Sequence, residues 1–544
     1  MRRLKIGIAQ INPTVGDLKG NLKKILTKVE EAEHAHLDLV VFSELVISGY
    51  PVWDLANKDS FIRANLESLK QLTAATHYKH VTVIVGFIDQ GPTSRKSYNA
   101  LAVIQKGKII HKQYKTLLPT YDVFLEQIFF ESGERQGIFH LNGIKITTSI
   151  CEDIWDDHYP TKPIKKAKER GAELLINISA SPFYSHALHA REQLVTRKAR
   201  QYGMGMVYVN QVGGQDDLVF DGRSMATDAS GNIFFKAPAF SEGLFTLDWA
   251  PGDKKMPARE WRVPNPTADI YKALATGLRD YVRKNNFSKV VIGLSGGIDS
   301  ALVATLAHDA LGSDAVLGVM LPGPFSSAGS VIDAKELGKN LGIQLRNISI
   351  KPNYQSHIQT KKVHGKITLA EENLQARLRG IELMYISNKE GCLLLSTGNK
   401  SEMAMGYSTL YGDMCGGLGV IGDVYKTEVC RLCHYRNRVT PVIPLATLTK
   451  APSAELRPNQ KDTDSLPPYE LLDKILFAYI EKNQTINTMA KIFKNRISHK
   501  LLSRIIRSVD HNEYKRRQSP PILRVTEKAW FGRRMPITNR FIEQ

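Results

Sequence analysis

The segment from Lys289 to Ser300, Lys-Val-Val-Ile-Gly-Leu-Ser-Gly-Gly-Ile-Asp-Ser, constrains the fold of this chain more than any other. A β-branched run ends in a Ser-Gly-Gly-Ile-Asp-Ser turn and continues directly into an apolar, helix-like run from Ala301 to Leu311. The two glycines let the backbone approach an anion closely, in dihedral angles that other residues avoid. Backbone N–H groups of such a turn converge with the helix N-terminus on a phosphate group. The sequence therefore predicts a strand, a phosphate-binding turn and a helix.

This turn is not a Walker loop, because no Gly-Lys-Ser/Thr follows it to reach a terminal phosphate. It resembles the PP-loop of the ATP pyrophosphatases, a family that binds the β,γ-diphosphate of ATP and transfers AMP. The resemblance implies that ATP contacts the residues of the turn, which are Gly293, Leu294, Ser295, Gly296, Gly297, Ile298, Asp299 and Ser300. Asp299 is also a candidate ligand for Mg²⁺, since a hard cation prefers carboxylate and phosphate oxygens.

The length and the cysteine content of the chain bound its class. At 544 residues it is too long for one hydrophobic core, so about two to four domains are expected. No apolar stretch approaches the ~20 residues that span a bilayer, and no signal sequence is recognised at the N-terminus. Five cysteines, an odd number, argue against a disulfide framework. We expect a cytoplasmic protein with no membrane partner.

The net charge of +19 raises the question of a nucleic-acid partner. The chain lacks an arginine-rich tract interleaved with aromatics, zinc-finger spacing and a basic tail. A basic surface suits small molecules that carry phosphates equally well. No nucleic-acid partner is therefore expected.

Two segments of alternating strands and helices, separated by a proline-rich stretch, divide the chain. Residues 1–249 alternate short strands with helices and end in a predicted hairpin of 224–228 and 233–236, which indicates a layered α/β domain. Residues 250–266 contain four prolines and several charges, so they are predicted to be a linker. Residues 267–544 also alternate helices with strands, which predicts a Rossmann-like, doubly wound parallel sheet that binds ligands at the carboxyl ends of its strands. Other strands are predicted at 5–9, 39–42, 81–87, 100–105, 144–150, 173–178, 206–210, 316–321, 345–349 and 393–396.

In the first domain three chemically useful residues follow or end predicted strands, and they are Glu44, Lys115 and Cys151. A thiol that attacks an amide needs a base to take its proton and a cation to stabilise the oxyanion. Cysteine, glutamate and lysine supply the thiol, the base and the cation. Each also has a simpler interpretation, as a capping glutamate, a solvated lysine and a buried structural cysteine.

The surrounding motifs favour the catalytic interpretation. Phe-Ser-Glu-Leu-Val-Ile-Ser-Gly-Tyr-Pro at 42–51, Lys-Thr-Leu-Leu-Pro-Thr-Tyr at 115–121 and Ile-Cys-Glu-Asp-Ile-Trp at 150–155 resemble the three signatures of the nitrilase family. The resemblance implies an αββα sandwich in which Cys151 forms a thioester, Glu44 transfers protons and Lys115 stabilises the oxyanion. Glu126 matches a second acidic residue often found near this triad.

The segment Asn-Ile-Ser-Ala-Ser-Pro-Phe at 177–183 resembles the glutamine-binding stretch of nitrilase-type glutaminases. Tyr121 and Ser181 stand at the positions that contact glutamine in that family. Two departures are present. The basic residue that commonly follows Phe183 is missing, with only histidines in 184–189, and the Asp and Arg usual around Glu126 are absent.

The second half carries further motifs, at 371–379, 395–402, 406–413, 423–428 and 513–520. They resemble those of the glutamine-dependent NAD⁺ synthetases, and with the nitrilase-like half the resemblance covers nearly the whole chain. It implies that deamido-NAD⁺ contacts Asn373, Arg377, Glu402 and Lys515, and that ATP contacts Thr397, Lys426 and Ser453. Glu402 would be the second carboxylate at Mg²⁺. The simpler interpretations are a helix-face pair for Asn373 and Arg377 and a solvated charge for Lys515.

Cys-Arg-Leu-Cys-His at 430–434 is literally a haem-attachment string, and a Cys-x-x-Cys pair can also be redox-active or bind metal. Haem attachment normally needs export, and no second pair completes a zinc site. We expect a helix with two half-buried thiols, without haem or zinc.

Taken together, the motifs predict hydrolysis of L-glutamine at Cys151 and transfer of the ammonia to a second site. There, deamido-NAD⁺ adenylated by ATP would become NAD⁺, with release of AMP and pyrophosphate. The resemblance also implies a homo-oligomer. The alternatives are another PP-loop amidotransferase, such as a GMP- or asparagine-forming synthetase, and a non-catalytic nucleotide- or RNA-binding protein on the same scaffold.

Overall fold

A computed structural model describes residues 2–91, 97–134, 136–252, 265–361, 367–494 and 496–541. The chain divides into two compact units, Met1–Pro264 and Asn265–Gln544. Most of the predicted linker lies outside the described residues, which omit 253–264.

Within its described residues, the first unit is built on two six-stranded sheets and a short hairpin. One sheet has the order β14-β1-β2-β3-β4-β5, and the other has the order β13-β12-β9-β8-β7-β6. The strands of the first sheet are β1 (Leu4–Gln10), β2 (Leu39–Val41), β3 (Thr82–Gln90), β4 (Ser97–Gln105), β5 (Lys108–Tyr114) and β14 (Gly243–Trp249). Those of the second are β6 (Ile138–Leu141), β7 (Ile144–Ile150), β8 (Leu174–Ser179), β9 (Gly205–Asn210), β12 (Met225–Thr227) and β13 (Ile233–Lys236), and the hairpin pairs β10 (Val212–Gln215) with β11 (Leu218–Asp221).

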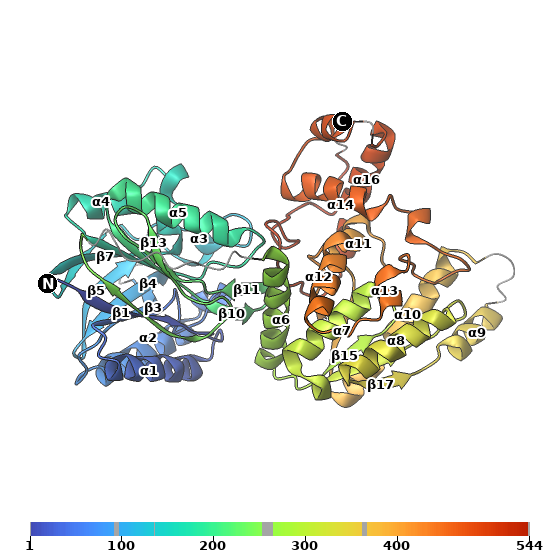
Figure 1. The fold of residues 1–544 in the computed structure, drawn as a ribbon, viewed down its shortest axis with the longest axis horizontal. Coiled ribbons are helices and arrows are strands. Elements are labelled where there is room, and N and C mark those ends of the chain that lie inside the picture. The colour runs from blue at the N-terminus through green and yellow to red at the C-terminus, as the bar shows by residue number, and fades with distance from the viewer. Residues whose placement is uncertain are drawn as a thin grey trace. The chain divides into compact units, whose positions relative to one another are not determined.

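Helices cover the outer face of each sheet, so the unit has four layers (Figure 1). Helices α1 (Leu18–His34) and α2 (Asp59–Ala75) pack on the first sheet through one apolar cluster. Helices α4 (Pro163–Glu169) and α5 (Ala187–Tyr202) pack on the second through another. A third cluster, which includes Ile6, Val41, Ile146 and Ile176, joins the inner faces of the two sheets. This is the αββα sandwich that the motifs predict.

The predicted strands of this unit are confirmed to within a few residues, and β12 and β13 pair antiparallel as expected for the hairpin. The prediction omitted β5, β6, β10, β11 and β14. Strand β14 closes the first sheet by pairing antiparallel with β1, so residues 243–249 lie beside residues 4–10.

The second unit contains a fully parallel sheet, with the order β17-β16-β15-β18-β19 in its described residues. Its strands are β15 (Val290–Gly293), β16 (Val316–Met320), β17 (Gln344–Asn347), β18 (Leu393–Ser396) and β19 (Leu418–Gly419). Strand β15 is apolar and buried because it is the central strand, with neighbours on both edges and helices over its faces. The doubly wound parallel sheet is therefore confirmed.

Helices connect these strands and form most of the C-terminal part (Figure 1). They are α6 (Pro266–Lys284), α7 (Ile298–Leu311), α8 (Ala328–Leu341), α9 (Lys351–Thr360), α10 (Leu369–Glu390), α11 (Lys400–Met405), α12 (Lys426–Val439), α13 (Leu445–Thr449), α14 (Tyr469–Leu476), α15 (Ile486–Ile492), α16 (His499–His511) and α17 (Glu513–Arg516). Helices α14 to α16 pack around their own apolar cluster, with Leu472, Ile486 and Leu502 at its centre. No helix within the described ranges is long and apolar enough to cross a membrane.

Candidate functional sites

Glu44 and Lys115 meet in the interior of the first unit. Glu44 follows β2 and Lys115 follows β5, and neither side chain is exposed to solvent. Lys115 Nζ lies 2.8 Å from Glu44 Oε1. Asn99 Nδ2 donates to the same oxygen at 2.7 Å, and the backbone N–H of Ala180 donates to Oε2 at 2.9 Å. These three contacts fix the orientation of the Glu44 carboxylate.

Lys115 also contacts a second carboxylate. Its Nζ donates to Glu126 Oε1 at 2.8 Å, and the hydroxyl of Tyr50 donates to that oxygen at 3.0 Å. Burial alone would lower the pKa of Lys115, but the Glu126 and Glu44 carboxylates hold it well above its usual value. Burial raises the pKa of Glu126 to about 7, against the opposing effect of Lys115. The ammonium ion is therefore held charged, while one of its carboxylate partners is easily protonated.

Cys151 directly follows β7 and begins a short 3₁₀ helix, Cys151–Ile154. Its φ is +42°, in the left-handed region that non-glycine residues rarely adopt, and its side chain is buried. A nucleophile on such a sharp strand-to-helix turn is directed away from the sheet. Burial and then the Glu44 carboxylate raise the pKa of the Cys151 thiol well above its usual value. The resting group is thus a thiol, and attack on a substrate requires a base.

Asp153 joins the turn that carries Cys151 to the segment that carries Lys115. Its Oδ1 accepts from the backbone N–H groups of Thr116 and Leu117, at 3.0 and 2.9 Å, and its Oδ2 accepts from that of Ile150 at 3.0 Å. The sequence interpretation did not assign Asp153, although it stands in the motif that contains Cys151.

Beside Cys151 lies a second carboxylate, that of Glu152. It accepts from the hydroxyl of Tyr121, at 3.0 and 3.1 Å, and from that of Tyr159 at 2.9 Å. Burial raises the pKa of Glu152 to about 7. Tyr121, one of the predicted glutamine contacts, is therefore held next to the nucleophile, and Glu152 and Tyr159 are site residues that the sequence interpretation missed.

Ser181, the other predicted contact, is held by two hydrogen bonds to Asn210. The backbone N–H of Ser181 donates to Asn210 Oδ1 at 2.8 Å, and the Ser181 carbonyl accepts from Asn210 Nδ2 at 3.1 Å. The nearest arginine after Phe183, Arg191, is buried and bound to Asp221 at 2.6 and 2.7 Å. Arg191 is thus committed to another partner and does not replace the missing basic residue.

The second unit holds a cavity of about 560 Å³ beyond the carboxyl ends of β15, β16 and β18. The PP-loop forms one wall. Gly296 has φ +78°, and a Cβ there would come 2.2 Å from the carbonyl oxygen of Ser330, so only glycine fits. Predicted residues that line the cavity are Gly293, Leu294, Ser295, Gly297, Ile298, Asp299, Ser300, Asn373, Thr397, Glu402, Lys426, Ser453 and Lys515.

Two carboxylates face one lysine in this cavity. Lys426 Nζ forms an ion pair with Asp299 Oδ2 and lies 4.0 Å from Glu402 Oε1. Asn399 Nδ2 donates to Asp299 Oδ1 at 3.0 Å. Burial and the neighbouring Asp299 raise the pKa of Glu402 to about 8. Two carboxylates with one facing ammonium fit a hard divalent cation that completes its shell with phosphate oxygens.

The described residues contain no group of three or more His, Cys, Asp or Glu side chains placed to hold a metal ion. The two carboxylates of Asp299 and Glu402 alone supply only part of the ligands that a divalent cation takes. Such a cation keeps most of its shell as phosphate and water oxygens.

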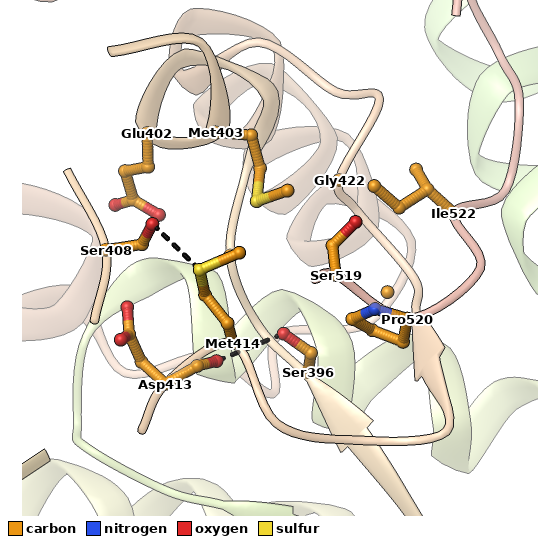
Figure 2. Close-up of a pocket in the computed structure, with 12 residues that line it drawn as sticks. Ser396, Glu402, Met403, Ser408, Asp413, Met414, Gly422, Ser519, Pro520 and Ile522 are labelled. Atoms are coloured by element: carbon orange, nitrogen blue, oxygen red, sulfur yellow. Dashed lines mark hydrogen bonds between the residues drawn. The ribbon is translucent and has the colours of Figure 1, made fainter. Parts of the chain in front are cut away.

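A smaller hollow adjoins this cavity, and Figure 2 shows Glu402, Met403 and Met414 around it. The hydroxyl of Ser408 donates to the sulfur of Met414 at 3.2 Å, and that of Ser396 donates to the carbonyl of Asp413 at 3.2 Å. The first bond lies within the 406–414 segment, and the second joins that segment to Ser396 at the end of β18.

Arg377, predicted to contact deamido-NAD⁺, does not line the cavity. Its Nε donates instead to the carbonyl of Leu410 at 3.2 Å. The arginine that lines the cavity is Arg379, two residues further along α10. A contact of Arg377 with the dinucleotide stays a prediction.

Comparison with known proteins agrees with this two-site arrangement. The family model for carbon-nitrogen hydrolases matches residues 5–253, and that for NAD synthase matches residues 270–519. The glutamine-dependent NAD⁺ synthetase of Thermotoga maritima is 42% identical over the whole of both chains, and that of Synechocystis sp. is 41% identical over 99% of each. The chain belongs to the glutamine-dependent NAD⁺ synthetase family.

Solved structures of this family have the same fold. The synthetase from Acinetobacter baumannii, in complex with ADP, is 37% identical and superposes with a TM-score of 0.78 over 99% of each chain. That from Cytophaga hutchinsonii, 22% identical, has a TM-score of 0.82 over 99% of this chain and 98% of its own.

In this member of the family, the haem-like string lies on helix α12. Cys430 is partly exposed, Cys433 is buried, and both are free thiols. The predicted helix is therefore confirmed.

Proposed function

We propose that this synthetase hydrolyses L-glutamine at Cys151 and uses the ammonia to amidate deamido-NAD⁺ in the PP-loop cavity, with cleavage of ATP to AMP and pyrophosphate. Its domains for the two reactions would be residues 1–249 and 267–544. The observation that carries the proposal is that one chain holds both a buried Glu44–Lys115 pair beside Cys151 and a phosphate-binding turn that opens into a large cavity.

In the first reaction, the Cys151 sulfur attacks the carboxamide carbon of glutamine and its proton passes to Glu44. The oxyanion of the tetrahedral intermediate is stabilised by the Lys115 ammonium, which the two carboxylates keep charged. The intermediate collapses when the proton returns to the leaving nitrogen, giving ammonia and a thioester. Water, deprotonated by Glu44, then hydrolyses the thioester to glutamate and restores the thiol.

In the second reaction, the carboxylate of deamido-NAD⁺ attacks the α-phosphorus of ATP, and pyrophosphate leaves. Backbone N–H groups of the PP-loop and the N-terminus of α7 would bind this diphosphate. Ammonia then attacks the acyl-adenylate carbon, AMP leaves, and loss of a proton gives the amide of NAD⁺. Lys426, Thr397 and Ser453 would contact ATP, while Asn373, Glu402 and Lys515 would contact the dinucleotide.

Asp299 and Glu402 would hold Mg²⁺, which supplies charge neutralisation on the phosphates when it is bound. Lys426 would then move from Asp299 toward the nucleotide, since a cation there competes with its ammonium.

We also propose that the protein is a cytoplasmic homo-oligomer. One feature that supports oligomerisation is an apolar stripe on α10, where Ile381 is 62% exposed and Tyr385 is 60% exposed one turn apart. The molecular mass in solution tests this assembly.

The test of the two-site function is Cys151→Ala assayed with glutamine and with ammonia as nitrogen donors. We expect loss of the glutamine-dependent synthesis of NAD⁺ and survival of the ammonia-dependent reaction. Asp299→Asn should impair both donors. Cys392→Ala, which removes a buried thiol elsewhere in the chain, is the matched control and should leave both reactions intact. Equal loss of both reactions in folded Cys151→Ala would refute separate sites.

A further inference from the structure

Helix α10 presents one face to the nucleotide cavity, and Arg379 belongs to that face. The residues of α10 that line the cavity recur at helical spacing, at Leu369, Glu372, Asn373, Ala376, Arg379, Gly380 and Leu383. Arg377, one turn after Asn373, is not among the residues that line the cavity, whereas Arg379, three residues after Ala376, is. The arginine of α10 that lines the cavity is therefore Arg379.

The Arg379 guanidinium is fixed in place by the backbone at the end of β16. Its Nε donates to the carbonyl oxygen of Leu321 at 3.0 Å, directly after the last residue of β16. A Cβ at Gly323 would come 2.8 Å from Arg379 Nη2, so the guanidinium lies against that glycine. The cation thus stands beyond the carboxyl end of the strand next to β15, where ligands bind in parallel sheets.

Arg379 has no carboxylate within 4.0 Å among the described residues, unlike two other cavity-lining cations. Lys426 is paired with Asp299, and Lys450 is paired with Asp333 at 2.9 Å. Burial lowers the pKa of Arg379 to about 10, and the more distant Glu455 and Asp413 only partly offset this. A partly buried guanidinium without a counter-ion is an incomplete interaction, because desolvated charges are normally paired.

We infer that Arg379 binds a phosphoryl group of a nucleotide in this cavity. The inference rests on the proposed function and adds a binding residue to it. The motif resemblance implies Arg377 for the dinucleotide contact, whereas the inference names Arg379. The guanidinium fork matches two phosphate oxygens, and Gly323 leaves room for it at the cavity wall. The phosphoryl group comes either from ATP or from deamido-NAD⁺, which bring the same chemistry to the cavity.

The test compares Arg379→Gln and Arg379→Lys with Lys389→Gln, a matched loss of charge at an exposed position on the same helix. Ammonia-dependent synthesis of NAD⁺ gives a KM for each nucleotide. Titration calorimetry with ATP alone and with deamido-NAD⁺ alone gives two dissociation constants without turnover.

For Arg379→Gln we expect the KM and the dissociation constant of one nucleotide to rise about tenfold to a hundredfold, as for loss of a hydrogen bond to a charged group. The nucleotide affected identifies the source of the phosphoryl group. Arg379→Lys should recover only part of the loss, because an ammonium cannot bind two oxygens as a fork. Lys389→Gln should leave both nucleotides unaffected.

Unchanged dissociation constants for both nucleotides in folded Arg379→Gln would overturn the inference, and so would a fall in kcat with unchanged affinities. The thermal midpoint separates binding from folding. Without nucleotide it should change little in Arg379→Gln, because loss of the hydrogen bond to the Leu321 carbonyl is offset by removal of a buried charge that has no counter-ion. The stabilisation by the affected nucleotide should shrink. If the wild-type protein binds ATP but makes no NAD⁺, the proposed function fails while the calorimetric test of Arg379 stands.

Discussion

Replacement of Asp153 by Asn separates the geometry of the glutaminase site from the stability of the fold. Asp153 accepts three backbone N–H groups, from Thr116, Leu117 and Ile150. In Asn one of the two oxygens becomes an NH₂ group that faces a donor. At least one buried N–H then loses its partner, which costs about 1–3 kcal/mol.

The loss of charge acts in the opposite direction. Burial raises the pKa of Asp153 from its ordinary 3.8 to about 6, so the ionised carboxylate is unfavourable in the folded protein at neutral pH. That difference corresponds to about 3 kcal/mol, which a neutral amide does not incur. The two effects nearly cancel, and we expect the free energy of unfolding of Asp153→Asn to stay within about 2 kcal/mol of the wild type.

The rate of glutamine hydrolysis, unlike the free energy of unfolding, should change strongly in Asp153→Asn. The lost hydrogen bond loosens the segment of Lys115 relative to the turn of Cys151, and a displacement of about 1 Å between reacting groups costs roughly a hundredfold in rate. We therefore expect glutamine hydrolysis to fall about a hundredfold, with the ammonia-dependent synthesis of NAD⁺ retained.

The assays are glutamate release, ammonia-dependent NAD⁺ formation and urea unfolding, each with Asp59→Asn as the control at an exposed position on α2. Glutamine hydrolysis within threefold of the wild type would refute the positioning role. A loss of both activities together with several kcal/mol of stability would instead mean that Asp153 supports the fold as a whole.

Two further predictions concern buried charges of the same unit. The pKa of Glu152 is raised from 4.5 to about 7, so its contribution to stability is fully present below pH ~4.5 and is lost as the pH rises through ~7, with a slope of up to about 1.4 kcal/mol per pH unit. Glu152→Gln should remove that slope in urea unfolding measured from pH 5 to 8, and parallel profiles for the two proteins would contradict the assignment. Lys115→Met leaves Glu44 and Glu126 without their shared cation, so unfolding free energy at pH 8 should fall by about 3–5 kcal/mol. If Lys115→Met with Glu126→Gln recovers none of that loss, the shared ion pair is not its cause.

The fold, and the places of Glu44, Lys115 and Cys151 after their strands, could be predicted from the sequence because both depend on local patterns. A β-branched run, a turn and an apolar helix identify β15 and α7, and Cys151 follows its strand in a motif of contiguous residues. The hydrogen-bond partners of Glu44 could not be predicted from the sequence. Asn99 reaches Glu44 from β4, two strands away in the same sheet, and Ala180 reaches it from the end of β8 only because the two sheets pack face to face.

Helix α10 shows a second limit of prediction from the sequence. The motif at 371–379 contains two arginines, and a helical repeat counted from Asn373 favours Arg377, whereas Arg379 is the one that lines the cavity. Which face lines the cavity still depends on how α10 packs on the sheet. Glu152 and Asp153 both follow Cys151 in sequence, but their contacts differ. Glu152 accepts from the hydroxyl of Tyr121, whereas Asp153 accepts from backbone N–H groups 36 and 37 residues away.

The strand order β17-β16-β15-β18-β19 places the phosphate-binding turn where the chain changes direction across the sheet. From β15 the connections run outward to β16 and β17 on one side and then to β18 and β19 on the other, so the helices on the two sides diverge and leave a crevice at this point. A single turn at the middle strand therefore borders the crevice from both sides. In the proposed reaction, ATP and deamido-NAD⁺ would reach that turn along different walls.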